Sequence, residues 1–160
     1  MKKSVLFLGL AVWMGLVGRV LAGDSPIKGG GNFGLGLEFG DPGVWGPVGM
    51  IWIDKENSFQ PALKLGNGSA LLQLDYLWHD YDLIKPSKGM LPFYFGAGGD
   101  LNIQNTVTVG VRGIVGIDYL FNQENIPVDI YVQAVPELWF NSGGGTAFYV
   151  YGNIGSRYYF

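Results

Sequence analysis

The residues best suited to chemistry surround the single histidine of the chain. The segment from Trp78 to Asp82 reads Trp-His-Asp-Tyr-Asp. A histidine beside carboxylates can bind a metal ion weakly or activate a water molecule as a general base. Ser69 and Ser87 are nearby in sequence and are candidate nucleophiles. The chain has no cysteine, which excludes disulfides, thiolate metal sites and thiol nucleophiles.

A serine hydrolase would need a serine within hydrogen-bond distance of His79, with a carboxylate to orient the imidazole. The chain resembles the lipid A deacylase barrels in its size and its final phenylalanine. That family places its serine two positions after its histidine, and this chain has Tyr81 there. Ser69 and Ser87 both look like turn residues, and His79 fits equally well at a strand end beside the interfacial aromatics Tyr76 and Trp78. We therefore expect no catalytic residues and no enzyme activity.

Charged residues fall on one face of the predicted strands. Facing lipid at mid-membrane, each would cost a few kcal/mol, so we expect them inside a barrel. Arg112 and Arg157 can each bridge two carboxylates through the planar guanidinium. This lumen could pass or bind a solute, but eight strands leave room only for side chains, which favours a packed ionic core. The expected network comprises Glu38, Lys64, Asp75, Asp100, Arg112, Asp118, Asp129, Glu137 and Arg157.

Eight segments of alternating polarity predict the strands that position these residues. The second is the least clear, because the run from Met50 to Ile53 is apolar on both faces. An even number of strands allows an antiparallel sheet to close. Pro136 falls inside the seventh segment and predicts a bulge there. The segments are Asn32–Phe39, Pro47–Asp54, Phe59–Gly66, Ala70–His79, Pro92–Gln104, Val107–Phe121, Val128–Phe140 and Ala147–Phe160.

The last segment is the clearest membrane strand. One face is mostly apolar with aromatic residues at both ends, and the other carries Asn153, Arg157 and phenolic hydroxyls. A final strand that ends on Phe160 resembles the signature by which the barrel-assembly machinery recognises bacterial outer-membrane barrels. Tyr158 and Phe160 are therefore the expected insertion signal.

The first residues predict export. Lys2 and Lys3 precede a short apolar run, and Val20 to Ala22 is a small-residue cleavage pattern. This combination is typical of a signal peptide over residues 1–22 that is cleaved after Ala22, which leaves a barrel domain over 23–160. Cleavage removes three of the ten basic residues and none of the thirteen acidic ones, so the remaining net charge is −6. That charge argues against nucleic-acid binding.

Both ends of an eight-stranded barrel should lie on the periplasmic side. The longest connection, Asp80–Met90, then also lies there, the reverse of the usual asymmetry in which the outer loops are longer. Either this barrel is unusual or the strand count is wrong by one. The predicted outer connections are short, which makes a receptor or adhesin role less attractive.

Three stretches resemble a family of small, uncharacterised bacterial outer-membrane β-barrel proteins of the OmpA-like eight-stranded type. They are Gly34–Pro42, Asp75–Tyr81 and Gly152–Phe160, although Gly43 to Gly46 departs from the Thr-Gly of the first motif. The resemblance implies an eight-stranded barrel in the outer membrane. It brings no known activity, so no functional residues are carried over.

The sequence thus predicts an all-β, eight-stranded antiparallel transmembrane up-and-down barrel in the cell outer membrane. The expected role is structural, in envelope integrity, or that of a narrow pore, without cofactor or metal. Its expected partners are outer-membrane lipid, lipopolysaccharide and, during insertion, the assembly machinery. The alternatives are an outer-membrane enzyme acting on lipid A or envelope lipid, and a soluble periplasmic barrel that binds a small apolar ligand.

Overall fold

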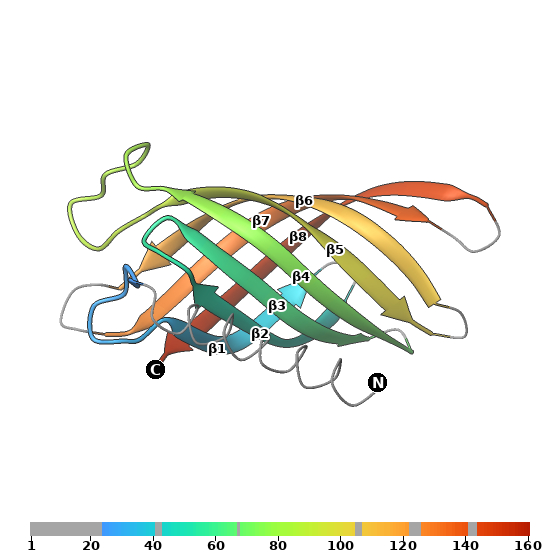
Figure 1. The fold of residues 1–160 in the computed structure, drawn as a ribbon, viewed down its shortest axis with the longest axis horizontal. Helices are drawn as coiled ribbons and strands as arrows, with labels where there is room; N and C mark the ends of the chain where they lie inside the picture. The colour runs from blue at the N-terminus through green and yellow to red at the C-terminus, as the bar shows by residue number, and fades with distance from the viewer. Residues whose placement is uncertain (1–23, 41–42, 67, 105–106, 122–125, 141–143) are drawn as a thin grey trace, which may run out of the picture.

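The chain folds into a closed barrel of eight antiparallel strands (Figure 1). The computed structural model describes residues 24–40, 43–66, 68–104, 107–121, 126–140 and 144–160, so the predicted signal peptide lies outside the described residues. The predicted fold class is confirmed. The strands are β1 (Phe33–Gly40), β2 (Val44–Trp52), β3 (Asn57–Gly66), β4 (Ser69–Asp80), β5 (Phe93–Ile103), β6 (Val107–Leu120), β7 (Val128–Phe140) and β8 (Thr146–Tyr159).

Each strand pairs with the next, and β1 closes the barrel against β8. That last pairing runs from Gly34 opposite Tyr159 to Gly40 opposite Asn153. Closure satisfies the backbone groups that an open sheet would leave unpaired at its edges. No helix in the described part of the chain is long and apolar enough to cross a membrane.

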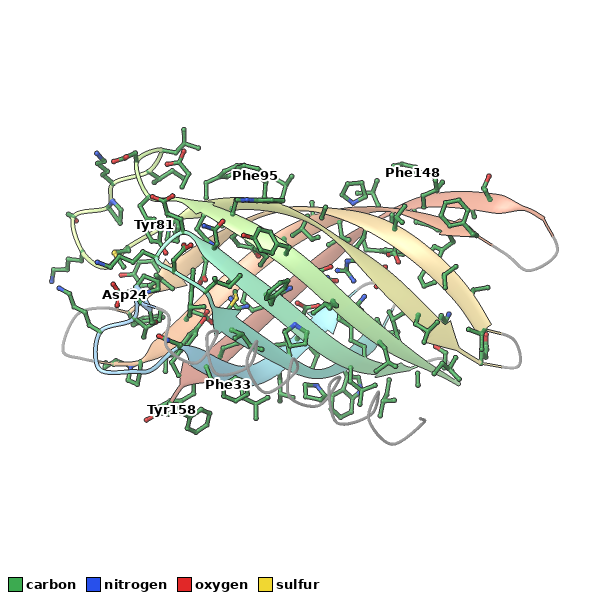
Figure 2. The ribbon with its side chains drawn as sticks, in the orientation of Figure 1. Asp24, Phe33, Tyr81, Phe95, Phe148 and Tyr158 are labelled. Atoms are coloured by element: carbon green, nitrogen blue, oxygen red, sulfur yellow. The ribbon has the colours of Figure 1, made fainter. Side chains whose placement is uncertain are left out.

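The two ends of the barrel differ. One end, here called the termini end, holds the segment that begins at Asp24, the C-terminus and the long connection between β4 and β5 (Figures 1 and 2). At the other end, here called the hairpin end, β1, β3, β5 and β7 finish and β2, β4, β6 and β8 begin. Because the strand count of eight is confirmed, the long connection does share an end with the termini, and the alternative of a miscount is wrong.

The outer face of the barrel is apolar. Figure 2 shows Phe95 and Phe148 pointing away from the barrel, and their side chains are 49% and 64% exposed. The same exposure recurs at every second residue along the strands, as period-2 alternation requires. Exposed apolar residues include Leu35, Leu37, Phe39, Trp45, Leu72, Leu74, Val109, Val111, Val115, Ile130, Val132 and Ile154.

The inner face is not uniformly polar, because β2 turns apolar side chains inward. Val48, Met50 and Trp52 are fully buried, whereas Ile51 lies on the outer face. They belong to an apolar cluster with Ile27, Leu77, Tyr94, Ile114, Leu120, Tyr131 and Tyr159. The apolar run of the second segment therefore reflects a strand with lipid-facing residues on one side and an apolar interior on the other.

The predicted bulge at Pro136 is absent. The β6–β7 register is the same on both sides of the proline, with Arg112 opposite Glu137 and Val115 opposite Ala134. Pairing to β8 continues unbroken through Pro136 and Val150. Gly113 lies across from Pro136 on β6 and leaves room for the proline ring. The pairing between β6 and β7 is therefore interrupted at the proline, but the register does not shift.

Candidate functional site in the barrel lumen

All nine charged residues expected in the lumen are buried inside the barrel, each at most 5% exposed. They come from every strand except β2. Alternation alone places them there, because each sits on the opposite face from its exposed apolar neighbours. They form one group centred on Arg157, a second centred on Arg112, and an ion pair between Glu38 and Lys64.

Arg157 lies at the centre of the larger group. Its Nε donates to Asp129 Oδ2 at 2.9 Å, and its Nη2 lies 2.8 Å from the same oxygen. Nη2 also reaches Asp118 Oδ2 at 3.2 Å, and Nη1 donates to Gln60 Oε1 at 2.8 Å. The guanidinium carbon lies 4.1 Å from the centre of the Tyr131 ring, a cation–π contact. One fully buried cation on β8 therefore contacts residues from three other strands, β3, β6 and β7.

Tyrosine and glutamine side chains connect this group to the ion pair between Glu38 and Lys64. Tyr131 donates from its hydroxyl to Glu38 Oε2 at 2.6 Å, and Gln133 Nε2 donates to the same oxygen at 3.2 Å. The second oxygen of Glu38 contacts Lys64 Nζ. Glu38 and Lys64 come from β1 and β3, and the strand between them carries Gly46 opposite Glu38. A side chain at Gly46 would collide with β3, so the glycine allows the close approach.

The second group centres on Arg112, which contacts one carboxylate on each of two strands. Its Nη1 donates to Asp100 Oδ1 at 2.8 Å, and its Nε lies 3.3 Å from Asp75 Oδ1. Glu137 is the direct cross-strand partner of Arg112 and also interacts with Asp100. Three carboxylates therefore surround one guanidinium in this part of the lumen.

Three buried tyrosine rings fill the lumen because each lies over a glycine of the adjacent strand. The direct cross-strand pairs are Gly34 with Tyr159, Gly116 with Tyr94, and Gly155 with Tyr131. A Cβ added at any of these glycines would lie 2.4 to 2.6 Å from the ring or its hydroxyl. The tyrosines then place their hydroxyls on acceptors, for example Tyr94 on Gln133 Oε1 at 2.9 Å.

The termini end of the lumen is sealed by apolar and aromatic side chains. His79 is 5% exposed, and its ring centre lies 4.5 Å from that of Trp52 and 5.3 Å from that of Tyr94. Its Nδ1 lies 3.1 Å from the carbonyl oxygen of Glu56. Ile27, from the segment before β1, packs in the same cluster.

The candidate chemical residues around His79 are not brought together. Ser69 begins β4, near the hairpin end, where its hydroxyl donates to the carbonyl of Gly66 at 3.0 Å. Ser87 is exposed in the β4–β5 connection. Tyr81 lies in the same connection, where burial and then the nearby Asp118 raise the pKa of its hydroxyl well above the ordinary value. The part of the chain that the structure describes has no cluster of three or more histidine and acidic residues that could hold a metal ion.

The hairpin end is open. A cavity of about 440 Å³, here called the vestibule, enters the lumen there and ends against the charged residues. Its wall combines the Arg112 and Lys64 side chains with amides, hydroxyls and aromatic rings. It is lined by Val44, Lys64, Ser69, Leu71, Gln73, Asn102, Gln104, Thr108, Arg112, Val135, Glu137, Trp139, Ala147, Tyr149, Tyr151 and Asn153.

Three features of the lumen could not be predicted from the sequence. The tyrosine–glycine pairs depend on the register between strands, which the alternation of one strand does not contain. Gln60 and Gln133 fall on the polar face, but nothing in their spacing marks them as links between ion pairs. The vestibule is lined by residues of the seven strands β2 to β8, so it depends on how the closed barrel brings these strands together.

Comparison with known proteins supports the barrel type and goes no further. No protein-family model and no curated protein matches the chain. Among solved structures, the chain is similar to the N-terminal β-barrel domain of OprF from Pseudomonas aeruginosa, with a TM-score of 0.57 and 16% sequence identity. The match covers 82% of this chain and 99% of that domain. At this identity the likeness shows a shared eight-stranded barrel fold.

Proposed function

We propose that the protein is an integral outer-membrane barrel whose role is structural, in the integrity of the cell envelope. The observation that carries the proposal is the combination of an apolar exterior with a charged, filled interior. In a water-soluble barrel that binds an apolar ligand, these two surfaces would be exchanged. Exposed apolar side chains on every strand fit contact with the acyl chains of lipid and lipopolysaccharide.

The filled lumen favours a structural role over a pore. The Arg157 group and the aromatic cluster at the termini end lie across the path from the vestibule to the other mouth. Arg157 and Asp118 have completely buried side chains. A continuous water path would require several of these side chains to move together.

A non-enzymatic role is part of the proposal. It is supported by the burial of His79 between two aromatic rings and by the separation of His79 from both candidate serines. An outer-membrane enzyme would need a nucleophile or an activated water molecule beside a substrate. Replacing His79 with alanine should therefore leave the lipid A profile of the cells unchanged, and an altered profile would revive the enzyme alternative.

The proposal is tested by fractionating cells that express the full chain and by comparing gel migration before and after boiling. Recovery in the outer membrane with a heat-dependent shift is the expected result, because a closed barrel resists dodecyl sulphate until it is heated. Recovery in the soluble periplasm without a shift would overturn it. A soluble folded barrel would then direct the search to a ligand for the lumen.

A further inference from the structure

We infer that the vestibule binds a primary aliphatic amine through the carboxylate of Glu137, the indole of Trp139 and neighbouring acceptor oxygens. Glu137 and Trp139 are two residues apart on β7 and both line the vestibule. This inference does not depend on the structural role proposed above, because a membrane barrel of either function could carry the site.

The first observation is a local excess of acceptors. Glu137 is 3% exposed, and its Oε1 receives no hydrogen bond from an amide, hydroxyl, ammonium or guanidinium group of the described residues. Within the same described set, the buried atoms Asp100 Oδ2 and Asn102 Oδ1 also receive no hydrogen bond from such a group. All three atoms accept hydrogen bonds. An alkylammonium group brings three N–H donors and no acceptor, which is what this arrangement lacks.

The second observation is that a glycine makes room between these groups. Gly110 of β6 is paired with Asp100 on one side and with Trp139 on the other. A Cβ built on Gly110 would lie 3.3 Å from Glu137 Oε1 and 3.3 Å from two carbons of the Trp139 ring. The carboxylate oxygen and the indole therefore border the same small space. A cation between a carboxylate and an aromatic face gains from both.

The third observation is the sign of the charge. Among the described residues, four buried carboxylates in this half of the lumen, Glu38, Asp75, Asp100 and Glu137, face two cations, Lys64 and Arg112. Lys64 is held by Glu38, and Arg112 by the two aspartates. The side chains of Glu137 and Asp100 are also hydrogen-bonded to each other, which two carboxylates can be only when they share a proton. A ligand ammonium group can take the place of that proton between the two carboxylates, whereas an anion would be repelled by them.

The ligands and walls of the vestibule fit an aliphatic amine better than a metal ion or a sugar. Hard metal ions take six or more oxygen ligands, and one oxygen of Asp100 is already used by Arg112. The walls include the apolar side chains of Val44, Leu71 and Val135. A volume of about 440 Å³ accommodates an alkyl chain of several carbons beyond the ammonium group.

The test is isothermal titration of the refolded full-length barrel in neutral detergent with putrescine. We expect saturable binding of putrescine and no binding of 1,4-butanediol, which has the same chain without the charges. Glu137→Gln should weaken putrescine binding at least tenfold. The matched control is Glu56→Gln, the same chemical change in an exposed turn at the termini end, and it should alter binding less than twofold.

A second variant protects the test against misfolding. Gly110→Ala adds one methyl group between the carboxylate and the indole without changing charge, and it should weaken putrescine binding while the heat-dependent gel shift is retained. Equal binding by Glu137→Gln and the parent would overturn the inference. So would equal binding of 1,4-butanediol, displacement of putrescine by Ca²⁺ at equal concentration, or binding of maltotriose in its place.

Discussion

We predict that replacing Arg157 with methionine strongly lowers the free energy of unfolding of the barrel. Methionine has a similar length and no charge, so the packing volume is largely kept while the hydrogen bonds are lost. The change leaves Asp118 and Asp129 buried without their cation. Removing one partner of a buried ion pair costs ~3–5 kcal/mol, and two carboxylates lose their partner here, so we expect the upper half of that range. A loss of ~4 kcal/mol is a change of about a thousandfold in the unfolding equilibrium.

The assay is urea unfolding of the barrel in phospholipid vesicles at neutral pH, followed by tryptophan fluorescence and by the gel shift. The matched control is Lys85→Met, which removes the same charge from an ion pair with Asp82 that lies in water, with side chains 71% and 90% exposed. An exposed ion pair of this kind contributes little, so no measurable change is expected. Asp129→Asn in the Arg157→Met background should recover part of the lost stability, because it removes one of the two buried carboxylate charges that no longer have a cation. Equal midpoints for Arg157→Met and Lys85→Met would refute the reasoning.

Four further predictions follow from the same geometry. Gly116→Ala should destabilise the barrel by ~1–3 kcal/mol in urea unfolding, because its methyl group meets a tyrosine ring, whereas Gly152→Ala, with open space around it, should be tolerated. Val111→Arg, on the proposed lipid face, should cost ~2–4 kcal/mol in vesicles and much less in short-chain detergent. Burial raises the pKa of Asp54, but hydrogen bonds from two backbone amides and an asparagine side chain outweigh it and hold the pKa below 3.8. The ionised Asp54 carboxylate therefore contributes stability above its unfolded-state pKa, and this contribution is lost as the pH falls through its folded-state pKa. Between pH 5 and pH 3, the urea midpoint of the parent protein should fall further than the urea midpoint of Asp54→Asn. Phe160→Ala should slow insertion in cells, measured by pulse-chase of the heat-shifted form, without preventing refolding in detergent.

Alternation was enough to predict the barrel because most strands have one apolar and one polar face. It failed at β2, where Met50 and Trp52 face an apolar part of the lumen while Ile51 faces outward. A period-2 pattern exists only where the two faces differ in polarity, so a strand with apolar surroundings on both sides carries no signal about its orientation. The same limit explains why the seal at the termini end was not expected.

The charged residues illustrate a second limit. Their side of each strand follows from the sequence, but their partners follow from the register and tilt of the whole barrel. Asp129 and Arg157 are direct cross-strand neighbours on β7 and β8, a pair that hairpin register alone would suggest. Glu38 and Lys64 meet across an intervening strand, over Gly46, which no local pattern indicates. Long-range pairing of this kind depends on how far each strand is displaced as the barrel closes.

The position of these groups along the lumen bears directly on whether the barrel could conduct. A solute in the vestibule meets Lys64, Arg112 and Glu137 in its wall, whereas Glu38 and the Arg157 group are not among the lining residues. Separating a buried pair without a replacement partner costs ~3–5 kcal/mol, so each such opening would be populated between about one part in two hundred and about one part in five thousand. The aromatic cluster around Trp52 would still close the far mouth. A steady current would thus require the charged groups and the aromatic cluster to open at the same time, whereas a ligand that stops in the vestibule requires none of these openings. The asymmetry of the lumen, open at the hairpin end and sealed at the termini end, therefore supports retention of a solute over its passage.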